Sequence, residues 1–594
     1  MQNPRYSRLL RATFGLVVVP VLLGSGLGLG GCATKAPQEI AAVAEDLSPI
    51  PAPEGHLADL FVPAPDATWT KARALVGGPA AFFPQSFGAL AATLLKLPVA
   101  VAAEIDGAVP VIGASLKKAP APAQAAIGIH VKAGGRFVDQ LTKGPDARFL
   151  GKLDETSRIT VLTTKSDTPG AVPQVAMGVL GNYLLIALNA ADLAAVGPYV
   201  VRTLAPRPAP KEDVAVEMPE AALSGPVLAE ARRSWETTRA GLDRIGAPVL
   251  LPVAGTVEML LDVLADSKQA RLTLDLAETA VHARMTMTPK PGGGAATKAI
   301  EEMAVGDLAP ILDLPASALL GMLWREPAAV RAAGIPRQAD AIAAKLGPDA
   351  KPEDKEAILA ALRAEDEARG DWVALGMSLE AIGPNAMVRA PLGDADKMTK
   401  ALKQLVALGK LASVKAQLKE AGLDVTSGKT VIENLPGDVQ RVRFERVQAK
   451  DAKSGVKDPK GAKDEKSKGA SPADGGIPTS IDLLYLVSKD ALFGAAGYDP
   501  KEALRALVKA PADGSFGSNA AIKAAVAPLG ADASFAVVVD PLRILAIRAG
   551  KSAPIEAAPV VIALGKTPQP STMWGRIDVA AIVVQELIKH RGAF

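Results

Sequence analysis

The sequence predicts an α+β protein in which mainly antiparallel sheets pack against helices. Short strand-like runs of apolar residues recur along the chain, for example at 126–131 and 438–447. Some runs are joined by hairpin signals such as Gly181-Asn182. Helical stretches follow these hairpins, one of them opened by the cap-like Asn189. Hairpin-joined strands with one helix-covered face form antiparallel sheets rather than βαβ units.

The order of these elements occurs twice, about 300 residues apart. The first copy has a strand, a helix, a strand, a hairpin and a helix, at 126–131, 135–141, 157–164, 175–188 and 189–204. The second has the same order at 372–392, 394–422, 438–447, 480–497 and from 499 onward. We therefore expect an internal duplication, against the alternative that α+β segments look alike by chance.

Changes in composition along the chain indicate five regions. The expected boundaries are 1–31 for a signal peptide, 32–55 for a tether rich in Pro and Ala, 56–297 for a first α+β half, 298–370 for a helical connector and 371–594 for a second α+β half. The prolines of the tether favour an extended chain, which would hold a body up to about 70 Å from a membrane. The C-terminal stretch 577–590 fits either a helix capped by Asp578 or a strand that runs into a helix.

One stretch of the second half is not expected to fold. Residues 449–477 hold seven lysines and five acids but no aromatic residue, so they bury too little apolar surface to offset the entropy of ordering. A flexible loop at a hairpin tip costs only about 0.6 kcal/mol for each doubling of its length. We interpret 449–477 as a solvated insertion, and a docking arm for an acidic or peptidoglycan partner is the alternative.

The N-terminus has the features of an export signal. Arg5, Arg8 and Arg11 precede the apolar run Phe14–Leu23, and the region holds no acid. This run is too short to span a bilayer comfortably. A basic start, a short apolar run and an exit of small residues are typical of a secretory signal. The G-x-G-x-x-G spacing in 26–31 ends this run instead of following a strand, so it does not predict a dinucleotide loop.

The exit of this signal is more specific. Leu29-Gly30-Gly31-Cys32 resembles the lipobox of bacterial lipoproteins, in which an aliphatic residue and two small residues precede a cysteine. The resemblance implies cleavage before Cys32, lipidation of its thiol and a membrane partner reached through this N-terminal anchor. Ala33 rather than Asp follows the cysteine, which in a Gram-negative cell implies an outer-membrane lipoprotein facing the periplasm. An ordinary signal peptide, or a single anchor near a buried cysteine, is the alternative.

Composition narrows the classes of partner. Removing residues 1–31 takes away three arginines and no acid, so the formal net charge falls from +3 to zero. A neutral body lacks the surplus of Lys and Arg that phosphate backbones attract, and aromatic residues for base stacking are only 4% of the chain. We therefore expect no nucleic-acid partner. Cys32 is the only cysteine, so no disulfide forms within the chain.

The sequence shows no recognisable catalytic or metal site. His56, His130, His282 and His590 are at least 74 residues apart, and no H-E-x-x-H phrase occurs. Ser115-Leu-Lys-Lys118 matches the S-x-x-K phrase of penicillin-recognising enzymes, but the S-D-N and K-T-G phrases that this family also needs are absent. We expect neither a cofactor nor a metal, and no catalytic residue is assigned.

A second resemblance concerns the body of the protein. The phrase Leu314-Pro-Ala-Ser-Ala318, with the strand-like segments around it, resembles uncharacterised exported bacterial proteins that often consist of two related halves. Such proteins begin a strand with a Leu-Pro-Ala-x-Ala phrase. The resemblance covers about residues 50–590 loosely; it favours the duplication and implies no active site.

These observations lead to a functional expectation. An anchor, a long tether and no catalytic constellation indicate a lipid-anchored envelope protein with a non-catalytic binding or scaffolding role, whose partner is an envelope protein, a lipid or another hydrophobic ligand. The alternative is a hydrolase that acts on an envelope polymer with scattered carboxylates or Ser115. The sequence does not identify a ligand-binding residue.

Overall fold

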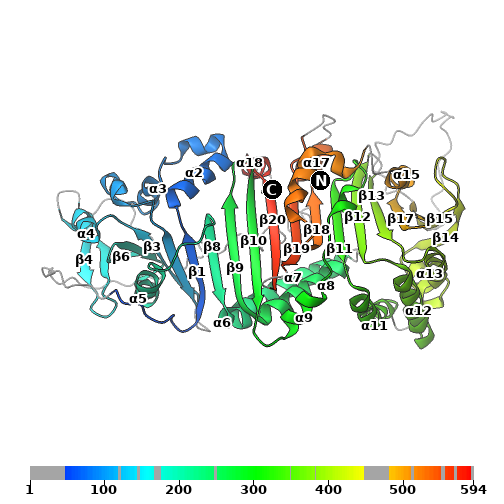
Figure 1. Ribbon diagram of the computed structural model, residues 1–594, viewed down its shortest axis with the longest axis horizontal. Coiled ribbons are helices and arrows are strands. Elements are labelled where there is room, and N and C mark those ends of the chain that lie inside the picture. Colours follow the sequence, from blue (N-terminus) through cyan, green and yellow to red (C-terminus); the bar gives the residue numbers. More distant parts are fainter. Residues whose placement is uncertain are drawn as a thin grey trace, which may run out of the picture. The chain divides into compact units, whose positions relative to one another are not determined.

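The computed structural model shows an α+β protein, so the predicted fold class is confirmed (Figure 1). It describes residues 47–117, 122–143, 147–165, 175–245, 251–347, 350–380, 383–446, 480–509, 514–549, 556–567 and 571–589. The predicted signal 1–31, most of the tether 32–55 and the insertion 449–477 lie outside these residues. The chain divides into two compact units: unit 1 is Met1–Glu301 with Thr567–Phe594, and unit 2 is Glu302–Lys566.

Unit 1 contains an antiparallel sheet with β1 near its middle. Its strands are β1 (His56–Val62), β2 (Val111–Leu116), β3 (Gln124–His130), β4 (Phe149–Leu153), β5 (Thr160–Thr164), β6 (Ala176–Leu180), β7 (Tyr183–Ala187), β8 (Val214–Pro219), β9 (Ser267–Leu276), β10 (Ala280–Pro289) and β20 (Thr572–Ala580). Their pairings give the order β4-β5-β6-β7-β3-β2-β1-β8-β9-β10-β20.

Helices cover both faces of the sheet around β2, β3 and β7, and further helices of unit 1 contact β9, β10 and β20. They are α2 (Pro65–Val76), η1 (Gly78–Phe82), α3 (Phe87–Leu94), η2 (Val99–Glu104), α4 (Gly134–Thr142), α5 (Ala190–Tyr199), η3 (Val200–Leu204), α6 (Glu220–Ala222), η4 (Leu223–Val227), α7 (Leu228–Ile245), α8 (Leu251–Ala265), α9 (Ala295–Glu302) and α18 (Ala581–Lys589). On one face, Ile112 and Leu185 pack with Leu193 of α5. On the other face, Leu184 packs with Phe137 of α4.

Unit 2 contains a second antiparallel sheet. Its strands are β11 (Leu320–Arg325), β12 (Trp372–Glu380), β13 (Gly383–Pro391), β14 (Leu423–Thr430), β15 (Val439–Arg446), β16 (Ser480–Val487), β17 (Ala491–Gly497), β18 (Ala533–Val539) and β19 (Val560–Thr567). Their order is β14-β15-β16-β17-β13-β12-β11-β18-β19. Its helices are α10 (Ala309–Leu312), α11 (Ala328–Lys345), α12 (Pro352–Ala368), α13 (Ala395–Leu408), α14 (Ala412–Glu420), α15 (Lys501–Lys509), η6 (Phe516–Ser518), α16 (Ala520–Val526), η7 (Ala527–Leu529) and α17 (Pro541–Arg548).

The two sheets follow one pattern of connections. In unit 1 the strands β4 to β7 are followed by β3, β2, β1, β8 and β9. In unit 2 the strands β14 to β17 are followed by β13, β12, β11, β18 and β19. Adding ten to each strand number of unit 1 thus gives the order in unit 2.

Most predicted elements occur where the sequence placed them. Gly181-Asn182 connects the hairpin β6–β7, and the Asn189 side chain accepts a hydrogen bond from the Asp192 amide at 2.9 Å to cap α5. The predicted helical stretch 394–422 is two helices, α13 and α14, separated at Gly409–Leu411. At the C-terminus, β20 runs directly into α18.

The two domain boundaries differ from the expected ones. The segment 298–370, expected as a helical connector, also contains β11, an inner strand of the unit 2 sheet. From Glu302 onward this segment belongs to unit 2, because its helices and β11 pack within that sheet's core. The end of the predicted second half, from Thr567, belongs instead to unit 1, where β20 pairs with β10 over eight residue pairs.

Candidate functional site

The residues predicted to carry the lipid lie outside the described residues. The lipobox, 29–32, precedes Leu47, where the described chain begins. From there the chain is held in unit 1, because the Ile50 amide donates to the Thr203 hydroxyl at 3.0 Å and that hydroxyl donates back to the Ile50 carbonyl at 2.6 Å. The lipid anchor therefore remains a prediction, and the chain that leads to it enters the fold through unit 1.

Each histidine in the described part of the chain contacts an aspartate. The pairs are His56 with Asp59 at 2.7 Å, His130 with Asp106 at 3.4 Å and His282 with Asp578 at 2.6 Å. The three pairs lie apart along the unit 1 sheet, on β1, β3 and β10. Within the described ranges, no group of three His, Cys, Asp or Glu side chains is placed to hold a metal ion. His590 is not among the described residues.

Ser115, the nucleophile of the S-x-x-K phrase, lies in β2. Its cross-strand neighbours are Ala58 on β1 and Ala125 on β3. Lys118, which would activate it, is outside the described residues. Neither neighbour is a base, so this arrangement gives no support to a serine nucleophile.

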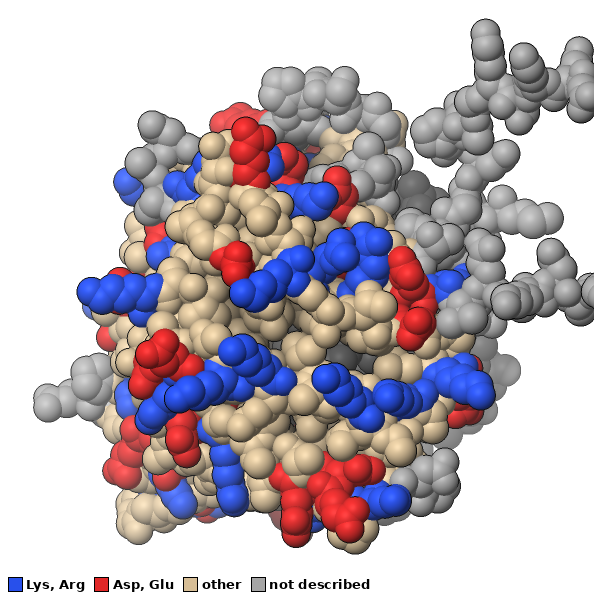
Figure 2. Space-filling view, turned by 90° about the vertical axis from the view of Figure 1, so that its right-hand side faces the viewer, with Lys and Arg blue, Asp and Glu red and all other residues tan. Residues whose placement is uncertain are grey.

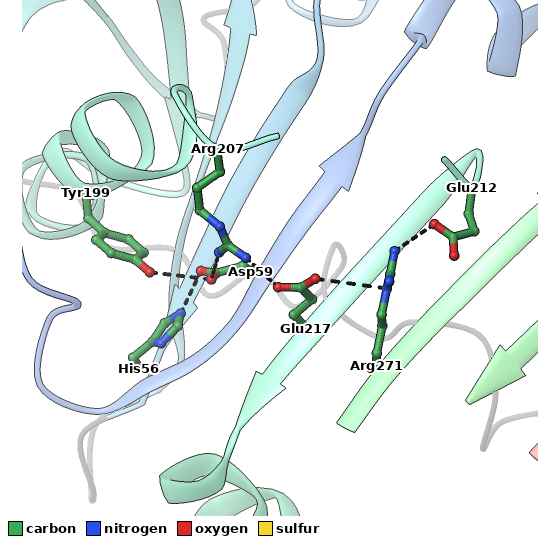
Figure 3. Close-up of polar contacts among 7 residues, drawn as sticks. All are labelled: His56, Asp59, Tyr199, Arg207, Glu212, Glu217 and Arg271. Carbon is green, nitrogen blue, oxygen red and sulfur yellow. Dashed lines mark hydrogen bonds and ion pairs between the residues drawn. The ribbon is translucent and has the colours of Figure 1, made fainter. Parts of the chain in front are cut away.

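A row of charged side chains crosses the unit 1 sheet (Figure 3). Asp59 on β1, Glu217 on β8 and Arg271 on β9 are directly opposite one another in neighbouring strands, so they share a face of the sheet. Arg207, from the segment after η3, donates to Asp59 at 2.9 Å and to Glu217 at 2.6 Å. We call the connected group the Asp59 network; it consists of His56, Asp59, Tyr199, Arg207, Glu212, Glu217 and Arg271.

Asp59 is the centre of this network and is almost fully buried. The Nε2 atom of His56 lies 2.7 Å from one carboxylate oxygen, while Arg207 and the Tyr199 hydroxyl donate to the other. Burial, reinforced by the charge of Asp59, raises the pKa of Tyr199 to about 12. With both oxygens engaged, Asp59 acts as a charged link between β1 and the segment after η3 rather than as an open general base.

A second charged group lies on the same sheet. The carboxylate of Asp578 on β20 accepts a hydrogen bond from Arg576 Nε at 2.9 Å and also contacts His282 of the neighbouring strand β10. Arg284 lies over the Trp574 ring, with its guanidinium carbon 5.8 Å from the ring centre. These residues are paired across β10 and β20, so they stabilise the strand pairing through cross-strand contacts.

Unit 2 has a shallow depression with aromatic and charged walls. Its lining residues are Trp324, Glu326, Arg331, Arg369, Asp371, Trp372 and Val373. It encloses about 130 Å³, counting space open to solvent. Sites that bury a small ligand enclose about 300–1,000 Å³, so this depression offers a surface contact rather than an enclosed active site.

Two glutamates near this depression have a raised pKa. Burial raises the pKa of Glu326 and of Glu365, although Arg369 acts in the opposite direction. Arg331 donates to Asp366 at 2.5 Å and to the Glu326 carbonyl at 2.8 Å, which fixes the acids around it. A carboxyl with a raised pKa near an ionised carboxylate is the arrangement that general acid–base catalysis uses, and structural ion-pair networks have it too.

One end of unit 2 carries rows of basic side chains with acidic clusters beside them (Figure 2). Figure 2 shows rows of Lys and Arg side chains across the middle of this face. Helix α13 contributes exposed Lys397, Lys400 and Lys403, and α14 contributes Lys415 and Lys419. Within the described part of the chain these lysines form no ion pair with a carboxylate. Figure 2 shows clusters of Asp and Glu beside these rows, so the charges of this face are mixed.

The unit 2 sheet also has an apolar face. Directly opposite residues of neighbouring strands form a row of apolar side chains, which consists of Val442, Leu483, Ala496, Ala386, Met377, Leu320, Val539 and Val560. The adjoining row includes Leu375, Met322, Val537 and Ile562. We call these two rows the apolar sheet face. Met377, Leu483 and Ile562 are 41%, 38% and 39% exposed, which is high for large apolar side chains in a sheet.

The opposite face of the same strands is closed. Gly321, Met387 and Leu484 lie on it, and the last two are buried. A Cβ atom on Gly321 would lie 3.1 Å from Ile311 and 3.3 Å from Phe516, so the helical segments pack directly on its backbone. The unit 2 sheet thus buries one face in its core. On the other face Met377, Leu483 and Ile562 are partly in water, while Met322, Leu375, Val442 and Val560 are buried.

Sequence reasoning named none of these surfaces. The apolar sheet face could have been suspected from the sequence, because β12 and β18 carry apolar residues on both of their faces. Strands of this pattern are expected to be covered on both sides. No sequence pattern could have predicted the Asp59 network, since Arg207 is 148 residues from Asp59. The depression is lined from the ends of β11 and β12, from α11 and from the segments that join them to the helices, so its residues are scattered along the sequence and form no motif.

Comparisons with known proteins give no relative. No protein family model, no curated protein and no solved structure matches the chain. Among the helices that the structure describes, none has both the length and the apolar composition needed to cross a membrane.

Proposed function

We propose that this chain is a lipid-anchored protein of the bacterial envelope with a non-catalytic binding role. The lipobox-like Leu29-Gly30-Gly31-Cys32 supports the anchor, and sorting to the outer membrane follows from Ala33. A body of zero formal net charge supports a partner other than nucleic acid. Its ligand is hydrophobic, of the acyl-chain type.

The apolar sheet face of unit 2 is the observation that carries this proposal. Its first row crosses eight strands without a polar side chain. At a strand spacing of about 4.8 Å this row is roughly 34 Å long. Within this row Met377 and Leu483 are partly exposed, whereas Val442 and Val560 are buried. Exposed large apolar side chains that lie on one face mark a binding site, and a row without charged or hydrogen-bonding side chains suits an acyl chain better than a polar ligand.

The test uses the mature chain from residue 32, with Cys32→Ser so that no attached lipid competes. Binding of the probe N-phenyl-1-naphthylamine is followed by fluorescence, and lipids that copurify are extracted and identified by mass spectrometry. Met377→Glu with Leu483→Glu is expected to weaken probe binding about tenfold or more, because charges are placed on the apolar row. Leu188→Glu is the matched control, since Leu188 is 51% exposed in unit 1.

The outcomes separate clearly. Probe binding that is lost in the double variant but kept in Leu188→Glu supports the proposal. Probe binding that is equal in all three proteins, with no lipid extracted from any of them, contradicts it. Circular dichroism of each variant checks that the fold is kept, which we expect because both substituted side chains are partly exposed.

The competing function is hydrolysis of an envelope polymer at the depression beside Trp324 and Trp372. The raised pKa of Glu326 favours it, because a protonated carboxyl is needed as a general acid. Purified peptidoglycan is incubated with the mature chain, and released fragments are measured. Hydrolysis that disappears in Glu326→Gln would establish the enzyme, while equal release by both proteins, or none, leaves the binding role.

We also propose that the two units arose by internal duplication. The common strand order supports this, because nine strands with two reversals of direction along the sheet are unlikely to recur independently. The recurrence of strand, helix, strand, hairpin and helix along the sequence supports it as well. Each unit then carries the same framework with its own surface.

A further inference from the structure

Two turns of unit 1 expose large apolar side chains to solvent. Phe82 and Phe83 end η1, just before α3, and Leu94 and Val99 follow at the other end of α3. Phe82 is 94% exposed, Leu94 71% and Val99 89%. Most large apolar side chains of the described chain are far less exposed, so these two turns are an unusual concentration.

The same stretch is nearly free of charge. Residues 74–103 contain a single charged residue, Lys96, although charged residues make up 22% of the chain. Lys96 is exposed and lies between Leu94 and Val99. The stretch 74–103, with its apolar tips, one cation and no acid, contributes no charge of its own that repels phosphate-bearing lipid headgroups.

The apolar turns are held on a fixed support. Trp69 of α2 donates from its indole nitrogen to the Pro84 carbonyl at 2.8 Å, and its ring meets the Phe83 ring edge-on at 6.1 Å. The Ser86 side chain caps α3 by accepting from the Ala89 amide at 3.2 Å. Because the turns are fixed in this way, Phe82 is presented to solvent by the fold itself.

We propose that these two turns insert into the headgroup region of a lipid bilayer and hold unit 1 against the membrane. This inference rests on the proposed lipid anchor, which brings the body to the membrane. The chain between Cys32 and Leu47 has 14 residues and reaches at most about 50 Å when extended. That chain enters unit 1 near Ile50, the same unit that carries the turns. The anchor fixes only the start of the chain to the membrane, and a second apolar contact would hold unit 1 itself at the membrane surface.

The experiment measures vesicle binding without the anchor. The mature chain with Cys32→Ser is mixed with vesicles of phosphatidylethanolamine and phosphatidylglycerol, and bound protein is separated by flotation. Phe82→Asp, Leu94→Asp and Val99→Asp together are expected to lower the vesicle partition coefficient about tenfold or more, because three apolar side chains lose their contact with lipid. Val431→Asp is the matched control, since Val431 is 84% exposed but lies in unit 2.

A second readout locates the contact. Phe82→Trp in vesicles with brominated acyl chains is expected to show strong additional quenching, and Val431→Trp none. Flotation and quenching that both depend on residue 82 support the inference. Failure of the Cys32→Ser chain to float, absence of quenching at residue 82, or a triple variant that dissociates a dimer while floating normally would overturn it. The state of Cys32 in native protein is measured separately, so failure of the anchor is distinguished from failure of this contact.

Discussion

Units 1 and 2 share one strand order, but the segment that follows the helix after the second hairpin contacts the first strand through different kinds of side chain in the two units. In each unit a helix follows the second hairpin, α5 or α15, and the chain then returns to the unit's first strand, β1 or β11. In unit 1 this return brings Arg207 to Asp59 of β1. In unit 2 it brings Phe516 against Gly321 of β11, where no side chain separates the ring from the strand.

The difference shows that a framework does not dictate how it is stabilised. The charged contact of unit 1 needs partners for its buried polar groups, and the Asp59 network supplies them for both carboxylate oxygens of Asp59. The apolar contact of unit 2 needs only shape, which glycine provides by leaving room for the ring. Unit 1 should therefore respond to pH and to the loss of single charges, and unit 2 to changes in volume.

The largest expected effect on stability comes from removing the contact between Phe516 and Gly321. Phe516→Ala should lower the free energy of unfolding by about 3–5 kcal/mol, because a fully buried ring leaves a cavity against Gly321. Denaturant titration followed by tryptophan fluorescence measures it. Phe82→Ala is the control, with a change within about 0.5 kcal/mol expected, since Phe82 is 94% exposed. Equal effects of the two variants would contradict the assignment.

A smaller effect on stability is expected from removing the ion pairs of Arg207 with Asp59 and Glu217. Arg207→Met should cost about 1–3 kcal/mol, because buried Asp59 and half-buried Glu217 lose their cation. Arg158→Met is the matched control: both arginines are 38% exposed, but Arg158 pairs with exposed Glu155. The control should change stability by less than about 1 kcal/mol. The comparison fails if Arg158→Met costs as much as Arg207→Met.

The alkaline pH dependence of unit 1 gives a third prediction. The pKa of Tyr199 is raised from 10.0 to about 12 in the folded state. The unfolded chain therefore loses this proton first, and the stability that Tyr199 contributes below pH 10 falls as the pH rises towards about 12. The loss should be on the order of 1 kcal/mol. Tyr199→Phe should remove this part of the slope, and an unchanged slope would show that burial does not hold the Tyr199 phenol in its protonated form.

The smallest effect concerns the acids of unit 2. Burial raises the pKa of Glu365 above 4.5, so the stability it contributes is present below that pH and is lost as the pH rises through its folded-state pKa. Glu365→Gln should flatten this slope and change stability at neutral pH by less than about 1 kcal/mol. Glu367→Gln, at an exposed position on the same helix, should keep the wild-type slope. A slope that both variants share equally would remove Glu365 as its source.

Local features of the fold were predictable from the sequence, because they depend on neighbouring residues. The hairpin at Gly181-Asn182 and the cap at Asn189 follow from backbone conformations that these residue types favour. The break between α13 and α14 was not predicted, although Gly409 marks it. The strand β11 was absorbed into an expected helical connector, because six residues between helical stretches give a weak period-2 signal.

The candidate sites depend on residues that the fold brings together from far apart. Arg207 reaches Asp59 across 148 residues, and His282 meets Asp578 across 296. No spacing rule encodes such pairs, because the register of strands distant in sequence decides them. The apolar turns beside α3 are an exception, since their low charge is visible in 74–103. What sequence alone did not show is that Phe82 and Val99 remain in solvent.

The measurement that tests the account most directly is mass spectrometry of the N-terminal peptide of the protein purified from its native membranes. The account predicts a peptide that begins at Cys32 and carries acyl chains on that residue. A peptide that retains Met1, or one in which Cys32 is unmodified, would contradict the proposed anchor and the envelope role built on it.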